Sequence, residues 1–159
     1  MRGYGYTSLS KTDLLVHLAS TSVFSCITHG LPTSISATDG YLAVSDINSF
    51  SSSAFDNLRF VYLGACYTGY DKEDFDNLVN AVYNKGADAV LGFIDEIWVE
   101  EANLWTQVFM TTLSEGATLE DAMSTADFVV RDELNNLPHF STDSEYRHLL
   151  GSEQLIPCR

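Results

Sequence analysis

Three short apolar segments, rich in β-branched and aromatic residues, constrain the fold of this 159-residue chain most strongly. They cover residues 21–28, 59–65 and 87–94. Segments with apolar residues at helical spacing precede, separate and follow them, at residues 11–19, 71–86, 100–115 and 118–134. Buried strands that alternate with amphipathic helices build a mostly parallel sheet with helices on both faces. The sequence therefore predicts one α/β domain over residues 1–159.

Smaller elements are predicted around this frame. Residues 34–37 and 41–44 flank Asp39-Gly40, a pair that supplies the positive φ angles of a tight β-hairpin. Ser45 is expected to cap a short helical turn, as Ser10 and Thr118 are expected to cap longer helices. A last strand is predicted at residues 146–150.

The charge of the chain excludes several classes of partner. Lys and Arg number 8 and Asp and Glu number 22, which gives a net charge of −14. Such a surface repels phosphate backbones and anionic lipids, so we expect no nucleic-acid and no membrane partner. The longest apolar stretch, residues 14–27, contains His17 and several serines and is shorter than the roughly 20 apolar residues of a membrane helix.

The predicted strands are followed by residues that can do chemistry. In parallel sheets, sites form at the carboxyl ends of strands, which here are followed by His29-Gly30, Cys66-Tyr67 and Asp95-Glu96. Imidazole and thiol together make an activated nucleophile, provided that the first two strands lie close in the sheet. The backbone N–H groups of Gly30 and Cys66 can then face a developing oxyanion. The alternative is a cysteine and a histidine that only pack.

Two motifs in this order resemble a known family. Thr28-His29-Gly30 and residues 63–69 (LGACYTG) are similar to the His-Gly and Ala-Cys signatures of clan CD cysteine peptidases, the caspase and gingipain superfamily that includes CHAT domains. Residues 39–47, 86–123 and 149–151 extend the resemblance over most of residues 13–155. It implies a caspase-like three-layer sandwich and an endopeptidase that acts on peptide or protein substrates without a cofactor. It further implies Cys66 as nucleophile, His29 as general base or acid and Gly30 beside the oxyanion.

The resemblance also bears on substrate preference. Many clan CD peptidases cut after Arg or Lys, and Asp95 and Glu96 would suit a basic side chain at this position in a chain of net negative charge. The alternative for these two carboxylates is a solvated loop, or the cap of the helix that begins near Glu100.

Two further interpretations stay open at this point. Clan CD domains usually begin with a further β-strand and helix, whereas ten residues precede the first predicted helix here, so the chain fits a larger parent protein with further domains. The second class of function is a catalytically silent CHAT-like module that serves as a binding or signalling scaffold.

No metal site is predicted. Cys26, His29 and Cys66 are residue types that bind zinc, but the odd separation of the first two directs them to opposite faces of a strand. The acidic residues 71–76 lack the glycine and the distal glutamate of a calcium-binding loop. Cys26 is therefore expected to pack in the core.

Overall fold

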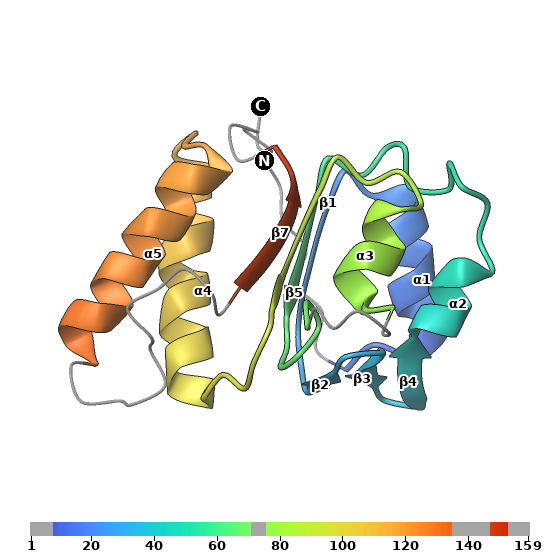
Figure 1. Ribbon diagram of the computed structural model, residues 1–159, viewed down its shortest axis with the longest axis horizontal. Coiled ribbons are helices and arrows are strands. Elements are labelled where there is room, and N and C mark those ends of the chain that lie inside the picture. The colour runs from blue at the N-terminus through green and yellow to red at the C-terminus, as the bar shows by residue number, and fades with distance from the viewer. Residues whose placement is uncertain (1–7, 71–75, 135–146, 153–159) are drawn as a thin grey trace.

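The main sheet has four strands. The computed structural model describes residues 8–70, 76–134 and 147–152 (Figure 1). The strands lie in the order β1-β5-β6-β7, and their bounds are Val23–Ile27, Phe60–Gly64, Ala89–Phe93 and Arg147–Gly151. The first three are parallel and β7 is antiparallel to β6. The mostly parallel sheet and the last strand are thus confirmed.

Helices cover both faces of this sheet, which makes three layers (Figure 1). On one side lie α1 (Lys11–Ser20), α2 (Val44–Asn48) and α3 (Leu78–Tyr83). On the other side lie α4 (Val99–Ser114) and α5 (Leu119–Glu133), which pack against each other. The α/β three-layer fold expected from the sequence is confirmed.

The side chains of β5 and β6 alternate between two hydrophobic clusters. Val61 and Leu63 enter the cluster beneath α1–α3, whereas Phe60 and Tyr62 enter the cluster beneath α4 and α5. Tyr62 stacks on Trp105 of α4 with ring centroids 5.7 Å apart. All residues of both central strands are buried, which explains why their sequences are continuously apolar.

A small antiparallel sheet lies beside the carboxyl ends of the parallel strands (Figure 1). It has the order β2-β3-β4, with bounds Gly30–Leu31, Ser34–Ala37 and Gly40–Ala43. The predicted hairpin corresponds to β3 and β4 and is confirmed. The short β2, which begins one residue after His29, was not predicted.

Two predicted helix starts are confirmed and two others are corrected. The side chains of Ser10 and Thr118 accept hydrogen bonds from backbone N–H groups of α1 and α5. The predicted cap at Ser45 is wrong, because α2 begins at Val44 and follows Ala43, whose N–H donates to the Asp46 carboxylate. Similarly, α3 begins only at Leu78, because the Asn77 side chain caps it. The acidic residues 71–75 lie outside the described residues.

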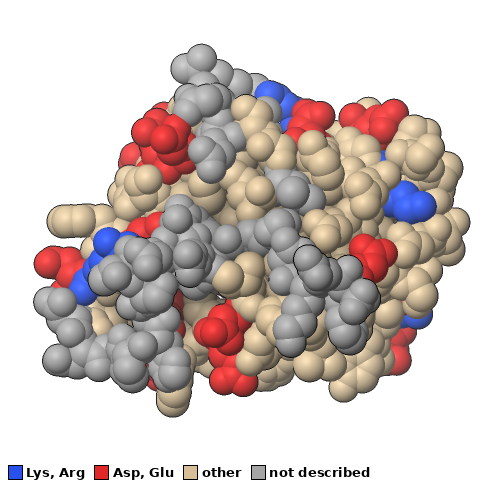
Figure 2. Space-filling view, viewed as in Figure 1, with Lys and Arg blue, Asp and Glu red and all other residues tan. Residues whose placement is uncertain are grey.

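On the face shown in Figure 2, acidic side chains lie at several separate places rather than in one patch. In the described residues, no helix is long and apolar enough to cross a membrane.

Candidate functional site

The parallel strands bring the predicted residues to one edge of the sheet. Strands β1 and β5 are direct neighbours, and Thr28 N–H continues the ladder by donating to the Gly64 carbonyl. The residues that follow these strands, His29 and Cys66, line one pocket of about 200 Å³. The structure therefore fulfils the condition that the two strands lie close in the sheet.

Gly30 lies directly against the Cys66 segment. A Cβ atom at Gly30 would lie 2.5 Å from the Cys66 carbonyl oxygen and 2.8 Å from the Ala65 Cβ. The sequence interpretation attributed this glycine to the approach of a substrate. In the structure it allows the backbone after β1 to approach the backbone after β5, next to the pocket that both His29 and Cys66 line.

The backbone at Gly30 also has a defined orientation. Ser36 N–H donates to the His29 carbonyl at 2.9 Å, so Gly30 occupies the next, non-hydrogen-bonded position of the β2–β3 pair. Its N–H therefore points away from β3. By contrast, the Tyr67 N–H already has an acceptor, because it donates to the Asp95 carbonyl at 3.3 Å.

The turn after Cys66 is fixed to the two central strands. Tyr67 has a φ of +61°, a conformation that is uncommon for a residue with a side chain. The buried Thr68 hydroxyl bonds to the carbonyls of Leu63 and Ala65, and Gly69 N–H donates to the Phe93 carbonyl at 2.9 Å. Multiple hydrogen bonds hold the strained backbone in place, so the position of the thiol is determined by the sheet.

The Cys66 thiol is half-buried and donates a hydrogen bond to the Ile97 carbonyl, with 3.7 Å between sulfur and oxygen. His29 is exposed. Although both residues line the same pocket, the thiol proton is directed to the segment before α4 and not to the imidazole.

Asp95 and Glu96 lie beside this pocket but do not line it. Both are exposed in the turn after β6, where Glu96 N–H donates to the Asp95 side chain at 2.8 Å. Partial burial and the neighbouring carboxylates of Glu96 and Asp95 raise the pKa of the Tyr67 phenol. The alternative that these carboxylates cap α4 is wrong, because Trp98 N–H at the start of that helix donates to Glu101 instead.

Several pocket residues were not singled out from the sequence. They come from the segment before α4 and from the first two turns of that helix: Ile97, Val99, Ala102 and Asn103. Three of them are apolar, which at a helix start indicates packing, and no local pattern shows that these four line a pocket with a cysteine.

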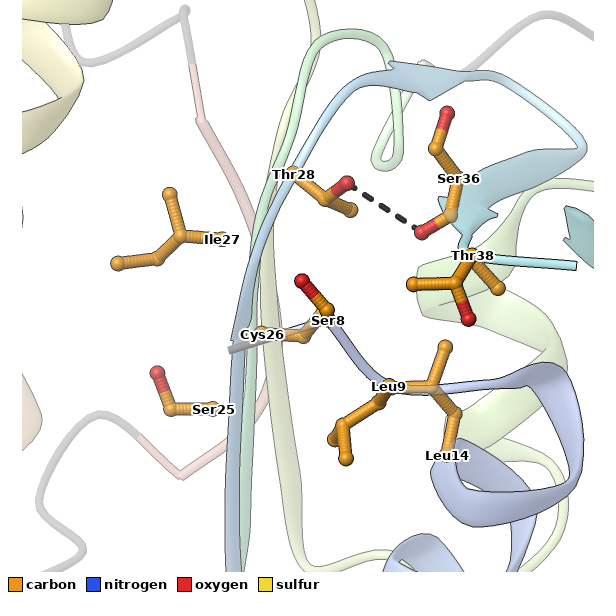
Figure 3. A pocket seen from close by; sticks show the side chains of 10 residues that line it. Ser8, Leu9, Leu14, Ser25, Cys26, Ile27, Thr28, Ser36 and Thr38 are labelled. Atoms are coloured by element: carbon orange, nitrogen blue, oxygen red, sulfur yellow. Dashed lines mark hydrogen bonds between the residues drawn. The ribbon is translucent and has the colours of Figure 1, made fainter. Parts of the chain in front are cut away.

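A second cavity, of about 370 Å³, lies on the opposite side of β1 (Figure 3). Cys26 and Thr28 point into it, and the Thr28 hydroxyl donates to the Ser36 carbonyl at 3.3 Å. Burial raises the pKa of the Cys26 thiol to about 11. Cys26 also packs against the first hydrophobic cluster, as expected from the sequence. Among the described residues, no group of three or more His, Cys, Asp or Glu side chains is arranged to hold a metal.

Comparison with solved structures identifies the fold. The chain superposes on a complex of the pro- and mature domains of Porphyromonas gingivalis RgpB with a TM-score of 0.76 and 12% identity, over 95% of its own length. It is also similar to the Arg-specific cysteine proteinase gingipain R (RgpB), with a TM-score of 0.69, 13% identity and 96% coverage. The chain therefore has a caspase-like α/β fold, which it shares with these two solved structures.

The comparisons also limit what is shared. The chain spans 38% and 37% of the length of these two solved chains. No protein-family profile and no curated protein matches the sequence. At this level of identity the likeness concerns the caspase-like fold, and the chemistry has to be argued from the residues themselves.

Proposed function

We propose that this chain is a clan CD-like cysteine endopeptidase, with Cys66 as nucleophile and His29 as general base and acid. The observation that supports this proposal is the meeting of the two side chains in one pocket at the carboxyl edge of the sheet. They reach it from neighbouring strands of a fold shared with a cysteine proteinase. A thiol beside an imidazole is a general arrangement for acyl transfer.

The proposed reaction begins when substrate displaces the Ile97 carbonyl from the thiol. The imidazole of His29 takes the thiol proton, and the Cys66 sulfur attacks the scissile carbonyl carbon. The C–N bond breaks as the imidazolium returns the proton to the leaving amine. Water then gives a proton to His29 and attacks the thioester, and the S–C bond breaks. The imidazolium returns this proton to the departing Cys66 sulfur, the carboxylic acid is released, and both residues return to their initial state.

We assign the oxyanion to the N–H groups of Gly30 and Cys66. The Gly30 N–H points away from β3, and its Cα lies against the Cys66 backbone. The Tyr67 N–H is less suitable because it already donates to Asp95. Two preorganised backbone donors of this kind typically contribute a large share of the stabilisation of a tetrahedral intermediate.

Basic substrates are favoured by the surroundings of the pocket. The exposed carboxylates of Asp95 and Glu96 lie beside Tyr67, directly after the nucleophile. A lysine or arginine side chain placed there would gain charge-assisted hydrogen bonds. The net charge of −14 would also increase the local concentration of cationic peptides.

Peptide hydrolysis by four variants tests the proposal. Cys66→Ala and His29→Ala should each abolish cleavage of a fluorogenic peptide library while the melting temperature stays close to that of the parent. The matched controls, Cys26→Ala and His17→Ala, should retain cleavage because these residues lie outside the pocket. Full activity of Cys66→Ala or of His29→Ala would refute the proposed roles.

The second candidate function is a silent binding or signalling scaffold. It is favoured by the hydrogen bond of the Cys66 thiol to Ile97, which leaves the thiol unpaired with His29 in the resting structure. Iodoacetamide labelling followed by mass spectrometry separates the two candidates. A peptidase predicts Cys66 labelling well below pH 8 that slows in His29→Ala, whereas a scaffold predicts the pH dependence of an ordinary thiol, with a pKa of about 8.5.

The domain organisation is also a proposal. We infer that residues 1–159 form one domain, because the main sheet joins β1, near the start of the chain, to β7, near its end. Further domains of a larger protein are proposed as partners, since the solved chains with this fold are more than twice as long.

A further inference from the structure

The pocket beside Cys66 has an apolar wall. Ten residues line it, and none of them is an acid, a lysine or an arginine: Ile27, Thr28, His29, Gly64, Ala65, Cys66, Ile97, Val99, Ala102 and Asn103. Ile27 is 52% exposed and Val99 is 66% exposed, although both are aliphatic. Covering such surfaces with another apolar group is favourable because it removes both from water.

Small residues line this pocket. Gly64 ends β5 in register with Ile27, and a Cβ atom there would lie 3.0 Å from the Tyr62 ring, so this position has room only for glycine. Ala102, in the first turn of α4, adds only a methyl group to the opposite wall. The resulting volume of about 200 Å³ is below the roughly 300–1,000 Å³ of typical ligand pockets. It suits one side chain rather than a whole small molecule.

The place of Cys66 in the pocket wall indicates which side chain of a substrate would enter the pocket. The thiol forms part of the pocket wall, so any residue whose side chain enters the pocket has its backbone next to the sulfur. The carboxylates of Asp95 and Glu96 lie outside, near Tyr67. A cationic side chain in the pocket would lose its hydration without gaining a counter-charge, which is costly.

We propose that this pocket is a specificity subsite for one uncharged aliphatic side chain of the substrate, such as leucine or valine. The proposal rests on the proposed peptidase function and deepens it. It separates two elements of recognition: an aliphatic residue enters between Ile27 and α4, and a basic residue lies over the acidic turn after β6. A substrate that carries both residues next to its scissile bond should therefore be preferred.

Reactivity of the thiol tests the subsite without requiring hydrolysis. The probes are iodoacetamides whose amide nitrogen carries an isobutyl, a 2-aminoethyl or no substituent. In each reaction the Cys66 sulfur forms a bond to the methylene carbon, iodide leaves, and the thiol proton goes to buffer. We expect the isobutyl probe to label Cys66 at least about 10-fold faster than the other two, within the roughly 10–200-fold range of small apolar pockets. Free glutathione provides the intrinsic rates.

Filling the pocket should remove this preference. In Ala102→Leu the larger side chain occupies the space. The ratios between the labelling rates of the three probes at Cys66 should then lie within about twofold of the ratios measured with glutathione. Gln107→Leu is the matched control, because Gln107 is exposed on the same helix and does not line the pocket. If Ala102→Leu fails to fold, Val99→Asp replaces it. Val99 is an exposed residue, and a carboxylate there should reverse the preference towards the aminoethyl probe.

The outcomes for the subsite and for the peptidase are distinguishable. If the three probes label Cys66 of the parent protein at equal rates after division by their rates with glutathione, the subsite is overturned, whatever the protein hydrolyses. An isobutyl preference that Ala102→Leu abolishes supports the subsite even if no peptide is cleaved, in which case the peptidase proposal alone fails. Cleavage of peptides with equal kcat/KM for leucine, lysine and glycine at every position next to the scissile bond would retain the peptidase and refute the subsite.

Discussion

Replacing Gly30 with alanine tests whether backbone contact positions His29 and Cys66 relative to each other. The added Cβ would lie 2.5 Å from the Cys66 carbonyl oxygen, whereas ordinary contacts begin at 3.4 Å. It would also lie 2.8 Å from the Ala65 Cβ, and neither atom belongs to a flexible side chain. The two backbone segments must therefore separate by about 0.9 Å to relieve the overlap.

This displacement has two expected effects. Overpacking typically costs about 1–3 kcal/mol, and the loss of glycine flexibility in the unfolded chain offsets about 0.4–1 kcal/mol of it. We expect the free energy of unfolding to fall by up to about 2.6 kcal/mol. A misplacement of about 1 Å at a reacting group can lower a rate by about 10²-fold. We expect cleavage, or His29-dependent labelling of Cys66, to fall by a similar factor.

Urea unfolding and Cys66 labelling measure the two effects separately. Leu31→Ala is the matched control, since Leu31 neighbours Gly30 in β2, is 54% exposed, and does not line the Cys66 pocket. The control should change both quantities little. If Gly30→Ala labelled and cleaved like the parent protein, the contact between Gly30 and Cys66 would not position His29 and Cys66, and our reasoning would be wrong.

Two further predictions concern buried groups in the two clusters. The Cys26 thiol has a pKa of 9.0 when unperturbed and about 11 when folded, so the unfolded chain ionises first as pH rises. The contribution of Cys26 alone should lower the free energy of unfolding by about 2–3 kcal/mol between pH 9 and 11, so Cys26→Ala should show a smaller fall over this range in urea unfolding. Tyr62→Phe loses the 2.8 Å hydrogen bond to Thr106 and should be less stable by about 0.5–1.5 kcal/mol in the same assay. An unchanged midpoint would contradict this second expectation.

The sequence predicts the frame of the molecule well because its central strands are continuously apolar. Strands β5 and β6 are buried on both faces, so their residues need no polar alternation and stand out in the sequence. The juxtaposition of His29 and Cys66 follows from this frame, since adjacent parallel strands end at the same edge. The family resemblance gave the same pair.

Features that depend on orientation rather than composition were not predictable. Strand β2 has two residues, too few to show any periodicity. Helix α2 is preceded by Ala43, whose backbone N–H, and not its side chain, forms the hydrogen bond to Asp46. An alanine is therefore not recognised as a cap from the sequence. Ile97, Val99 and Ala102 face Cys66 only because α4 begins where it does relative to the sheet. This relation is tertiary and leaves no local signal.

The full burial of β5 and β6 also determines how the molecule opens. Amide protons in the middle of these strands, such as those of Tyr62 and Leu91, should exchange with solvent only when the whole domain unfolds. The turn that carries Asp95 and Glu96 is exposed and lies outside both hydrophobic clusters. Its amides should exchange through local openings of much lower free energy. The turn at Asp95 and Glu96 can therefore open while the sheet beneath it stays intact.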